Sequence, residues 1–404
     1  MMMVFWIFLN FFGLFLASIK LRAANPFQIY FFVWSLLSLV YGITADTWIP
    51  VSDVFFIFLM MPSLMALGFL FVISSEIIEN VHSKGLVPVN RRMGQIVFVL
   101  QILVWISLPL SYIRATELAG GYDLFNVEAY TQLRSAMVND ELGYGGLGYF
   151  FVLSYVVTSL SVFLYKGGII SGGRFSFSFL TSFLFCYLAT GRTFILFFLC
   201  LLIVPLILNR FIGYRGILFS FLILIFVFIF VSLMTAKGVS FDVDFYDNVN
   251  SFLKNLRSYT AAPLLAFFTI FDSGSPMDLG ENSFRFFFSV FNRFGLGDFK
   301  IIPLVRDYVE VPDLTNVYTV YEPYFLDFSY FGFVFPFIFL MVHFFLYKKS
   351  FVNGGVWVFL YAASVYPLAM QFFQDQYFSL LSTWIQVCFW FWFIFHFSKR
   401  WRDD

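Results

Sequence analysis

Charged residues and cysteines are scarce in this chain. Only 12% of its 404 residues are charged, and 24 Lys and Arg are balanced by 24 Asp and Glu. This composition excludes an ordinary soluble globular protein, and the zero net charge provides no general attraction to nucleic acid. The three cysteines, Cys186, Cys200 and Cys388, lie in apolar segments without a CxxC pair. They predict packing residues rather than metal ligands or disulfides.

Long apolar segments take the place of charge, with 61% hydrophobic residues and 64 Phe. The segments run for about 16 to 22 residues without alternation, which suits helices that cross ~30 Å of hydrocarbon and not barrel strands. We therefore expect an all-α polytopic membrane protein with about eleven transmembrane helices, forming one integral membrane domain over residues 1–404. The expected spans are 2–18, 28–45, 54–73, 95–113, 147–165, 175–189, 193–208, 217–234, 324–347, 355–370 and 377–397.

The basic residues of the short connectors predict the orientation of these spans. Fourteen Lys and Arg fall on one side of the membrane, against three in short connectors on the other. The positive-inside rule then places the C-terminus in the cytoplasm and the N-terminus outside. Two outer segments are long enough to build a site, residues 114–146 and residues 235–323. The three histidines, His82, His343 and His396, fall on the inner side, so we expect none of them to act at the outer face.

Arg192 is the only charged residue between Phe175 and Leu208. These 34 residues are too many for one crossing and suit two helices that fold back at residues 189–193. A guanidinium in or near hydrocarbon costs roughly 2.5 to 3.5 kcal/mol, so such a residue is a functional candidate by default. The alternative is an arginine that only anchors a helix end at the interface.

The loop 235–323 contains an amphipathic pattern over residues 282–294. Asn282 is the expected helix cap and Gly295 the expected end, with Arg285 and Arg293 on the polar flank. Arginine binds phosphate oxygens in a bidentate manner, so we expect these two to bind the diphosphate of a polyprenyl lipid. The alternative is an interfacial helix whose arginines meet only membrane lipid headgroups. The apolar flank carries four phenylalanines at helical spacing, Phe284, Phe287, Phe288 and Phe291.

Residues 315–332, at the start of the ninth span, are rich in Tyr, Asn, Glu and Asp. This composition suits a sugar, held by aromatic stacking and hydroxyl hydrogen bonds. Glu322 and Asp327 are both candidate general bases, because a carboxylate shielded from water accepts a hydroxyl proton well. The alternative is an interfacial tyrosine belt in which Asp327 bonds to a neighbouring helix. The candidate sugar ligands are Asn316, Tyr318, Tyr321 and Tyr324.

Two other segments of the long loop have simpler interpretations. Residues 259–271 are apolar but too short to cross the membrane, so we expect a re-entrant or interfacial segment. Asp242 and Asp244 imitate the DxD metal motif of enzymes that use sugar nucleotides. Because those substrates are cytoplasmic and this loop is expected outside, we predict a solvated acidic loop and no metal site.

The chain resembles the Wzy-type O-antigen polymerases in three features. They are the 190–193 Thr-Gly-Arg-Thr hairpin, the arginine-bearing outer loop, and residues 315–319 followed by Asp327, Phe328 and Gly332. These oligosaccharide repeat unit polymerases are Gram-negative inner membrane proteins, similar to C-class glycosyltransferases, that work on the periplasmic face without metal or cofactor. The resemblance implies that both substrates are linked to undecaprenyl diphosphate. The growing glycan would pass to the nonreducing end of a new lipid-linked repeat unit, with a chain-length regulator protein as a further partner.

The resemblance also implies roles for individual residues. Arg192, Arg285 and Arg293 would hold the diphosphate and stabilise the leaving charge, while Glu322 or Asp327 would deprotonate the acceptor hydroxyl. Related O-antigen ligases use an outer-face histidine, which this chain is expected to lack, and this favours a polymerase. The alternatives are a ligase or another lipid-carrier glycosyltransferase, and a flippase or other transporter. Transporters usually carry internal repeats and place charges deep in several spans, whereas here the charge is concentrated in outer loops.

Overall fold

The computed structural model describes residues 1–44, 49–73, 85–139, 143–213, 216, 259–274, 277–311 and 314–399, with the backbone alone for Val138, Asn139 and Arg192. Described residues are mostly helical, as expected for an all-α protein, and one antiparallel hairpin pairs Val309 with Thr315. The predicted span 217–234 and the Asp242–Asp244 pair lie outside the described residues. The elements are α1 Met2–Lys20, α2 Pro26–Ile43, α3 Asp53–Val72, α5 Arg91–Leu118, α6 Val127–Asn139, η2 Gly145–Leu147, α7 Gly148–Lys166, α8 Gly172–Leu188, α9 Arg192–Leu208, α12 Ala262–Ser273, α13 Arg285–Arg293, β1 Val309–Glu310, β2 Leu314–Thr315, α14 Tyr321–Phe328, η3 Ser329–Phe333, α15 Val334–Val352, α16 Val356–Ala369 and α17 Leu381–Lys399.

Among the described residues, seven helical segments are long and apolar enough to cross a membrane. They comprise α1, α2, α3, α5, η2 with α7, the run Tyr321–Val352, and α17. Helices α8 and α9 have 17 residues each and meet at the tight turn expected around Gly191, where Thr190 has a φ of 55°. The segment expected to be too short for a crossing forms the 12-residue helix α12. The total of eleven spans remains a prediction.

Helix α1 shows why these helices belong in a membrane. Most of its phenylalanines point outward: Phe8 is 63% exposed and Phe15 62%, whereas Trp6 is buried. Its buried face carries Asn10, whose side-chain oxygen accepts a hydrogen bond from the Ser63 hydroxyl of α3 at 3.1 Å. A Cβ at Gly13 would lie 2.3 Å from the Phe31 ring, so glycine is required for the close approach of α2. Small and polar residues inside with phenylalanines outside are typical of helices solvated by lipid.

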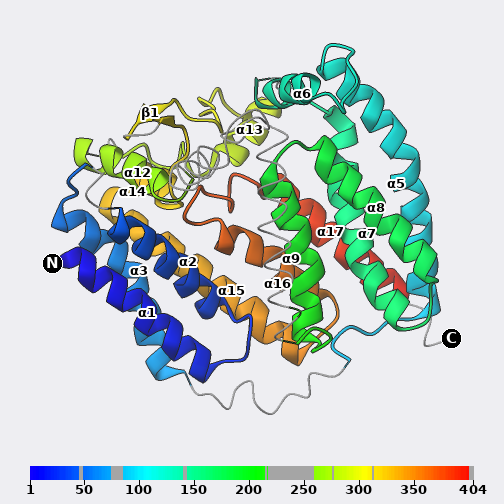
Figure 1. The fold of residues 1–404 in the computed structure, drawn as a ribbon, viewed down its shortest axis with the longest axis horizontal. Helices are drawn as coiled ribbons and strands as arrows, with labels where there is room; N and C mark the ends of the chain where they lie inside the picture. Colours follow the sequence, from blue (N-terminus) through cyan, green and yellow to red (C-terminus); the bar gives the residue numbers. More distant parts are fainter. Residues whose placement is uncertain are drawn as a thin grey trace, which may run out of the picture. The chain divides into compact units, whose positions relative to one another are not determined.

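The chain folds into two compact units, each assembled from separate stretches of sequence. Unit 1 contains Met1–Val81, Asn250–Lys348 and Ser364–Ser382, and unit 2 contains His82–Val249, Lys349–Ala363 and Thr383–Asp404. In unit 1, α1 packs on α2 and α3, and α12 contacts α14. In unit 2, α5, α7 and α8 pack against one another, as the cyan and green helices show (Figure 1). The segment 114–146, expected to lie outside the membrane, begins inside α5 and contains α6, in unit 2.

Hydroxyl groups hold the helices of unit 2 together. The Thr158 hydroxyl of α7 lies 2.7 Å from the Ser182 hydroxyl of α8, and both are buried. The Gln101 side chain of α5 donates to the Ser161 hydroxyl of α7 at 3.0 Å and also to Ser178 of α8. Such bonds contribute roughly 0.6 kcal/mol each to helix association in a membrane.

An aromatic cluster in unit 1 fixes helix α14. The Tyr321 ring stacks on Phe267 of α12 at 5.8 Å and lies 5.5 Å from both Trp34 of α2 and Phe58 of α3. Each such pair contributes about 0.5 to 1.5 kcal/mol beyond the area that it buries. After α14, the chain turns at Ser329, and Gly332 packs so tightly that a Cβ there would lie 2.7 Å from the Tyr324 carbonyl carbon. The cluster therefore sets the position of Glu322, the residue after Tyr321.

Candidate functional site

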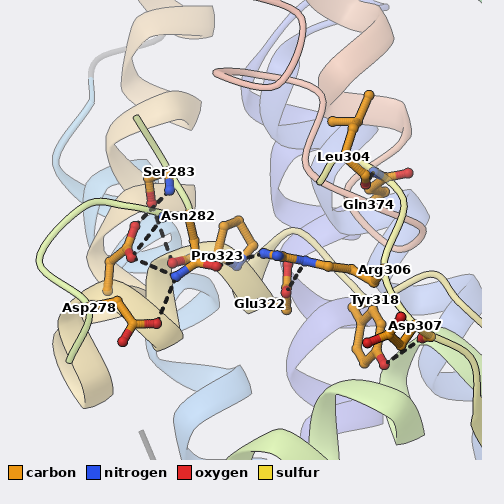
Figure 2. Close-up of polar contacts among 11 residues, drawn as sticks. Asp278, Asn282, Ser283, Leu304, Arg306, Asp307, Tyr318, Glu322, Pro323 and Gln374 are labelled. Carbon is orange, nitrogen blue, oxygen red and sulfur yellow. Dashed lines mark hydrogen bonds and ion pairs between the residues drawn. The ribbon is translucent and has the colours of Figure 1, made fainter. Parts of the chain in front are cut away.

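Glu322, in the first turn of α14, forms an ion pair with Arg306 of the preceding loop. The Arg306 Nε atom lies 2.7 Å from the Glu322 Oε1 atom, with the two side chains 22% and 9% exposed. Arg306 also donates through Nη2 to the Asn282 side-chain oxygen at 2.8 Å. Figure 2 shows its guanidinium between Asn282 and Glu322. Pro323 fits at this point because the first turn of a helix needs no amide hydrogen from that position.

These three residues belong to a cleft within unit 1, which we call the Glu322 cleft. The free space at its centre is about 30 Å³, enough for a water molecule or two and too little for a sugar ring. A sugar would therefore have to lie across the mouth, with only a smaller group inside. The polar side chains that line the cleft are Asn282, Arg285, Arg306, Asn316, Tyr318, Glu322, Gln374, Asp375 and Ser379.

Arg285 is the second cation of the Glu322 cleft. It is the first residue of α13, is partly buried, and has no hydrogen bond or ion pair with any residue that the structure describes. Burial, followed by the neighbouring Arg306 guanidinium, lowers the pKa of Arg285 below its usual value. A guanidinium stays protonated even so. Burial and repulsion from Arg306 therefore raise the free energy of the charged Arg285 side chain. An anion bound between the two arginines would lower it.

The structure separates the two candidate bases. Asp327 is fully buried, and both of its carboxylate oxygens accept hydrogen bonds from residues of the preceding loop. Oδ1 accepts from the Asn282 amide at 3.1 Å and its side chain at 2.9 Å, and Oδ2 accepts from the Ser283 amide at 2.7 Å. Asp327 does not line the cleft. We interpret Asp327 as a structural anchor, because its lone pairs are engaged away from the cleft, and its role as a general base stays an untested prediction.

Replacing Asp327 with Ala should destabilise the protein. The change leaves the buried amides of Asn282 and Ser283 without acceptors, at about 1 to 3 kcal/mol each. We expect a loss of roughly 2 to 5 kcal/mol in the free energy of unfolding, measured by denaturation in detergent. The exposed Asp298 provides the control, since its replacement with Ala removes a carboxylate that makes no such bond. If Asp327→Ala unfolds like the wild type yet loses all activity, the structural assignment is wrong.

Asp375 is the other buried carboxylate at the Glu322 cleft, and both of its oxygens also accept hydrogen bonds. Its Oδ1 accepts from the Tyr324 hydroxyl at 2.9 Å and the Tyr377 amide at 3.1 Å, and its Oδ2 accepts from the Ser379 amide at 3.1 Å. Burial raises the pKa of Asp375, while these hydrogen bonds act in the opposite direction. The carboxylate thus shapes the turn that brings Gln374 and Ser379 to the cleft. Glu322 remains the carboxylate with the fewest structural contacts.

One histidine lies closer to this cleft than the charge pattern indicates. The His343 Nε2 atom of α15 is 2.9 Å from the Tyr377 hydroxyl, and the Tyr377 amide in turn donates to Asp375. The Gln371 side chain also donates to the Tyr377 hydroxyl, at 2.9 Å. His343 therefore supports the wall of the cleft from behind, although it does not line the cleft itself.

The candidate sugar ligands divide into two groups. Asn316 and Tyr318 line the Glu322 cleft, and the Tyr318 hydroxyl donates to the Asp307 carbonyl at 3.3 Å (Figure 2). Tyr321 and Tyr324 are fully buried and do not line it. We interpret both as packing residues, because Tyr321 belongs to the aromatic cluster and Tyr324 stacks on Phe335 at 4.7 Å, and their role as sugar ligands stays an untested prediction. Direct stacking on a ligand would require both rings to leave the core.

The arginine-bearing helix is shorter than its pattern indicates. Helix α13 begins at Arg285, and Asn282 binds Asp327 and Arg306 instead of capping it. Arg293, the last residue of α13, is exposed and does not line the cleft. Arg192 is the first residue of α9 in unit 2, and its side chain is outside the described part of the structure. Of the three predicted arginines, only Arg285 is thus placed at the Glu322 cleft.

Sequence reasoning did not select Arg306, the central cation of the cleft. It lies in an irregular stretch without helical or strand periodicity, 16 residues before its partner Glu322. The one available signal was its isolation, since no other Lys or Arg occurs between Lys300 and Lys348. Gln374, Asp375 and Ser379 were also missed, although polar residues are dense between α16 and α17.

Comparisons with protein families, curated proteins and solved structures give no match for this chain. The chemistry of the Glu322 cleft is therefore argued from its own residues.

Proposed function

We propose that this chain is a metal-independent, polyprenyl-diphosphate-dependent glycosyltransferase that polymerises undecaprenyl-diphosphate-linked O-antigen repeat units at the periplasmic face of a Gram-negative inner membrane. The observation that carries the proposal is the Glu322 cleft: a buried carboxylate, an arginine paired with it, and a second arginine without a described partner. Two guanidinium groups and one carboxylate suit a reaction that releases a diphosphate and removes one proton.

The ion pair provides a way to couple substrate binding to the base. Arg306 is shared between Glu322 and Asn282, and a lipid diphosphate entering beside Arg285 would compete for its guanidinium. Phosphate oxygens bind arginine more strongly than the neutral Asn282 oxygen does, and a diphosphate carries more negative charge than the single Glu322 carboxylate. Once Arg306 turns to the diphosphate, the Glu322 carboxylate is free to accept a proton. The cleft would thus activate its base only when the donor is bound.

The proposed step is a substitution at the anomeric carbon of the donor glycan. The acceptor hydroxyl on the nonreducing end of a lipid-linked repeat unit attacks this carbon, and its proton passes to Glu322. A bond forms between the acceptor oxygen and the anomeric carbon, and the bond from that carbon to the diphosphate oxygen breaks. Undecaprenyl diphosphate leaves with the electron pair, and Arg285 and Arg306 stabilise its charge. Asn316 and Tyr318, at the cleft wall, would orient the sugar.

The direct test uses purified full-length protein with a synthetic undecaprenyl-diphosphate-linked repeat unit, with the products separated on a gel. A ladder of glycans that differ by one repeat unit is expected. A deletion strain distinguishes the alternatives: loss of a polymerase leaves single repeat units on the lipid core, whereas loss of a flippase leaves none. Transfer of finished glycan to the lipid core, without a ladder, would assign the chain to the ligases instead.

Arg285 and Arg293 provide a matched pair for the diphosphate role. Arg285→Ala should lower the rate of polymerisation by about 10²- to 10³-fold, as when one donor to a developing anion is removed. Arg285→Lys should restore only part of the rate, because the planar fork is lost. Arg293→Ala removes the same charge from the same helix outside the cleft and should stay near wild type. Equal losses in both Ala variants would mean that surface charge, and not the cleft, matters.

In the same assay Arg192→Ala tests the predicted role of the α8–α9 turn.

A further inference from the structure

Unit 2 contains a second cleft, at the end of the bundle where α5 and α8 begin and α7 ends. Its volume is about 520 Å³, and Arg91, Gln95, Phe98, Gly168 and Arg174 are among the residues that line it. We call it the Arg174 cleft. Its described lining contains two arginines and no acidic residue. The basic residues of these connectors predict that this end of the bundle faces the cytoplasm.

Arg174 is held in place as a rigid cation on the wall of this cleft. Its Nε donates to the Gln101 side-chain oxygen at 2.6 Å, and its Nη2 donates to the Gly94 carbonyl at 3.0 Å. The guanidinium carbon lies 4.5 Å from the centre of the Phe98 ring. All three partners are neutral, so none of them balances the charge. The fixed geometry removes the entropy that a free arginine would lose on binding an anion.

Arg91 contributes a second uncompensated charge to the Arg174 cleft. It is the first residue of α5, is exposed, and has no hydrogen bond or ion pair with the described residues. Opposite the arginines, Gly168 has a φ of 69° and no atom within 4 Å of its Cβ position, so the α7–α8 turn leaves the cleft open. Basic pockets between transmembrane helices on the cytoplasmic side typically bind phosphate-bearing headgroups.

We propose that the Arg174 cleft is a binding site for a phosphate group, held between Arg91 and Arg174, separate from the Glu322 cleft. The same chemistry recognises the phosphodiester of an anionic phospholipid and a free inorganic phosphate. Phe98 is 42% exposed, and an apolar ring beside the Arg174 guanidinium, in the same lining as Arg91, suits a headgroup whose acyl chains continue along α5.

The test measures ligand binding to the purified full-length protein by native mass spectrometry in detergent. The probes are phosphatidylglycerol, diacylglycerol as the lipid without phosphate, and inorganic phosphate. Arg91→Gln removes one cation, and Gln95→Glu places a carboxylate on the cleft wall without removing a described contact. Both positions are exposed, so neither change threatens folding. The controls are Arg92→Gln, the neighbouring arginine outside the lining, and Gln95→Ala.

Wild type should bind phosphatidylglycerol or inorganic phosphate but not diacylglycerol, and both cleft variants should bind roughly tenfold more weakly. Binding of the lipid alone identifies a headgroup site, and binding of inorganic phosphate alone identifies a soluble anion; either result supports the proposal. Unchanged binding in both Arg91→Gln and Gln95→Glu overturns it. An equal loss in Arg92→Gln also overturns it, because surface charge would then explain the binding.

Discussion

Replacing Glu322 with Gln should abolish polymerisation while leaving the protein folded in the membrane. The amide cannot take the acceptor proton, and loss of a general base typically lowers a rate by about 10²- to 10⁴-fold. Folding should be affected less than by the loss of Arg306, because the Gln side-chain oxygen can still accept from the Arg306 Nε atom, where the pair now measures 2.7 Å, and the remaining cation is 22% exposed. The measurement is the rate of ladder formation by purified protein, normalised to the amount of folded protein.

The control for this substitution is Asp307→Asn, next to Arg306 in the chain. Asp307 is exposed and does not line the Glu322 cleft, so the same carboxylate-to-amide change should leave the rate near wild type. A second variant, Glu322→Asp, keeps the charge but shortens the side chain, and should retain intermediate activity. Wild-type rates in Glu322→Gln would remove the base role, and Asp375 would then be the remaining carboxylate at the cleft.

The membrane helices were predictable because length and apolar composition decide them locally. Ten of the eleven expected segments overlap described helices, seven helical segments among the described residues are long and apolar enough to cross a membrane, and the turn between α8 and α9 lies where the Gly191 segment predicts it. Local pattern also found residues that line the cleft, among them Arg285, Asn316 and Glu322. Each of these residues stood out in the sequence as a polar or charged side chain close to an apolar segment.

The partners within the cleft could not be predicted, because they come from positions far apart in the sequence. Tyr324 and Asp375 are separated by 51 residues, and Asn282 and Asp327 by 45. No periodicity links such positions, so Glu322 and Asp327 were equivalent candidates from sequence. In the structure they differ in their hydrogen-bond donors. Asp327 accepts from the backbone amides of residues 282 and 283, and Glu322 accepts from the Arg306 guanidinium.

Replacing Arg306 with Ala should lower both the stability of the protein and its activity. It leaves Glu322 as a buried carboxylate without its cation, and breaking a buried ion pair in this way costs about 3 to 5 kcal/mol. It also leaves the Asn282 side-chain oxygen without its described donor. We expect a loss of this size in the free energy of unfolding, measured in detergent, together with loss of the glycan ladder.

A double variant separates the structural part of this effect from the chemical part. Arg306→Met combined with Glu322→Gln removes both charges and fills the space with neutral side chains. Replacing a buried ion pair with neutral groups of similar volume is often neutral or stabilising, so the double variant should recover most of the lost stability. It should remain inactive, because neither the base nor the diphosphate ligand is restored. Recovery of activity along with stability would show that the pair only holds the fold, and the catalytic role of the Glu322 cleft would have to be abandoned.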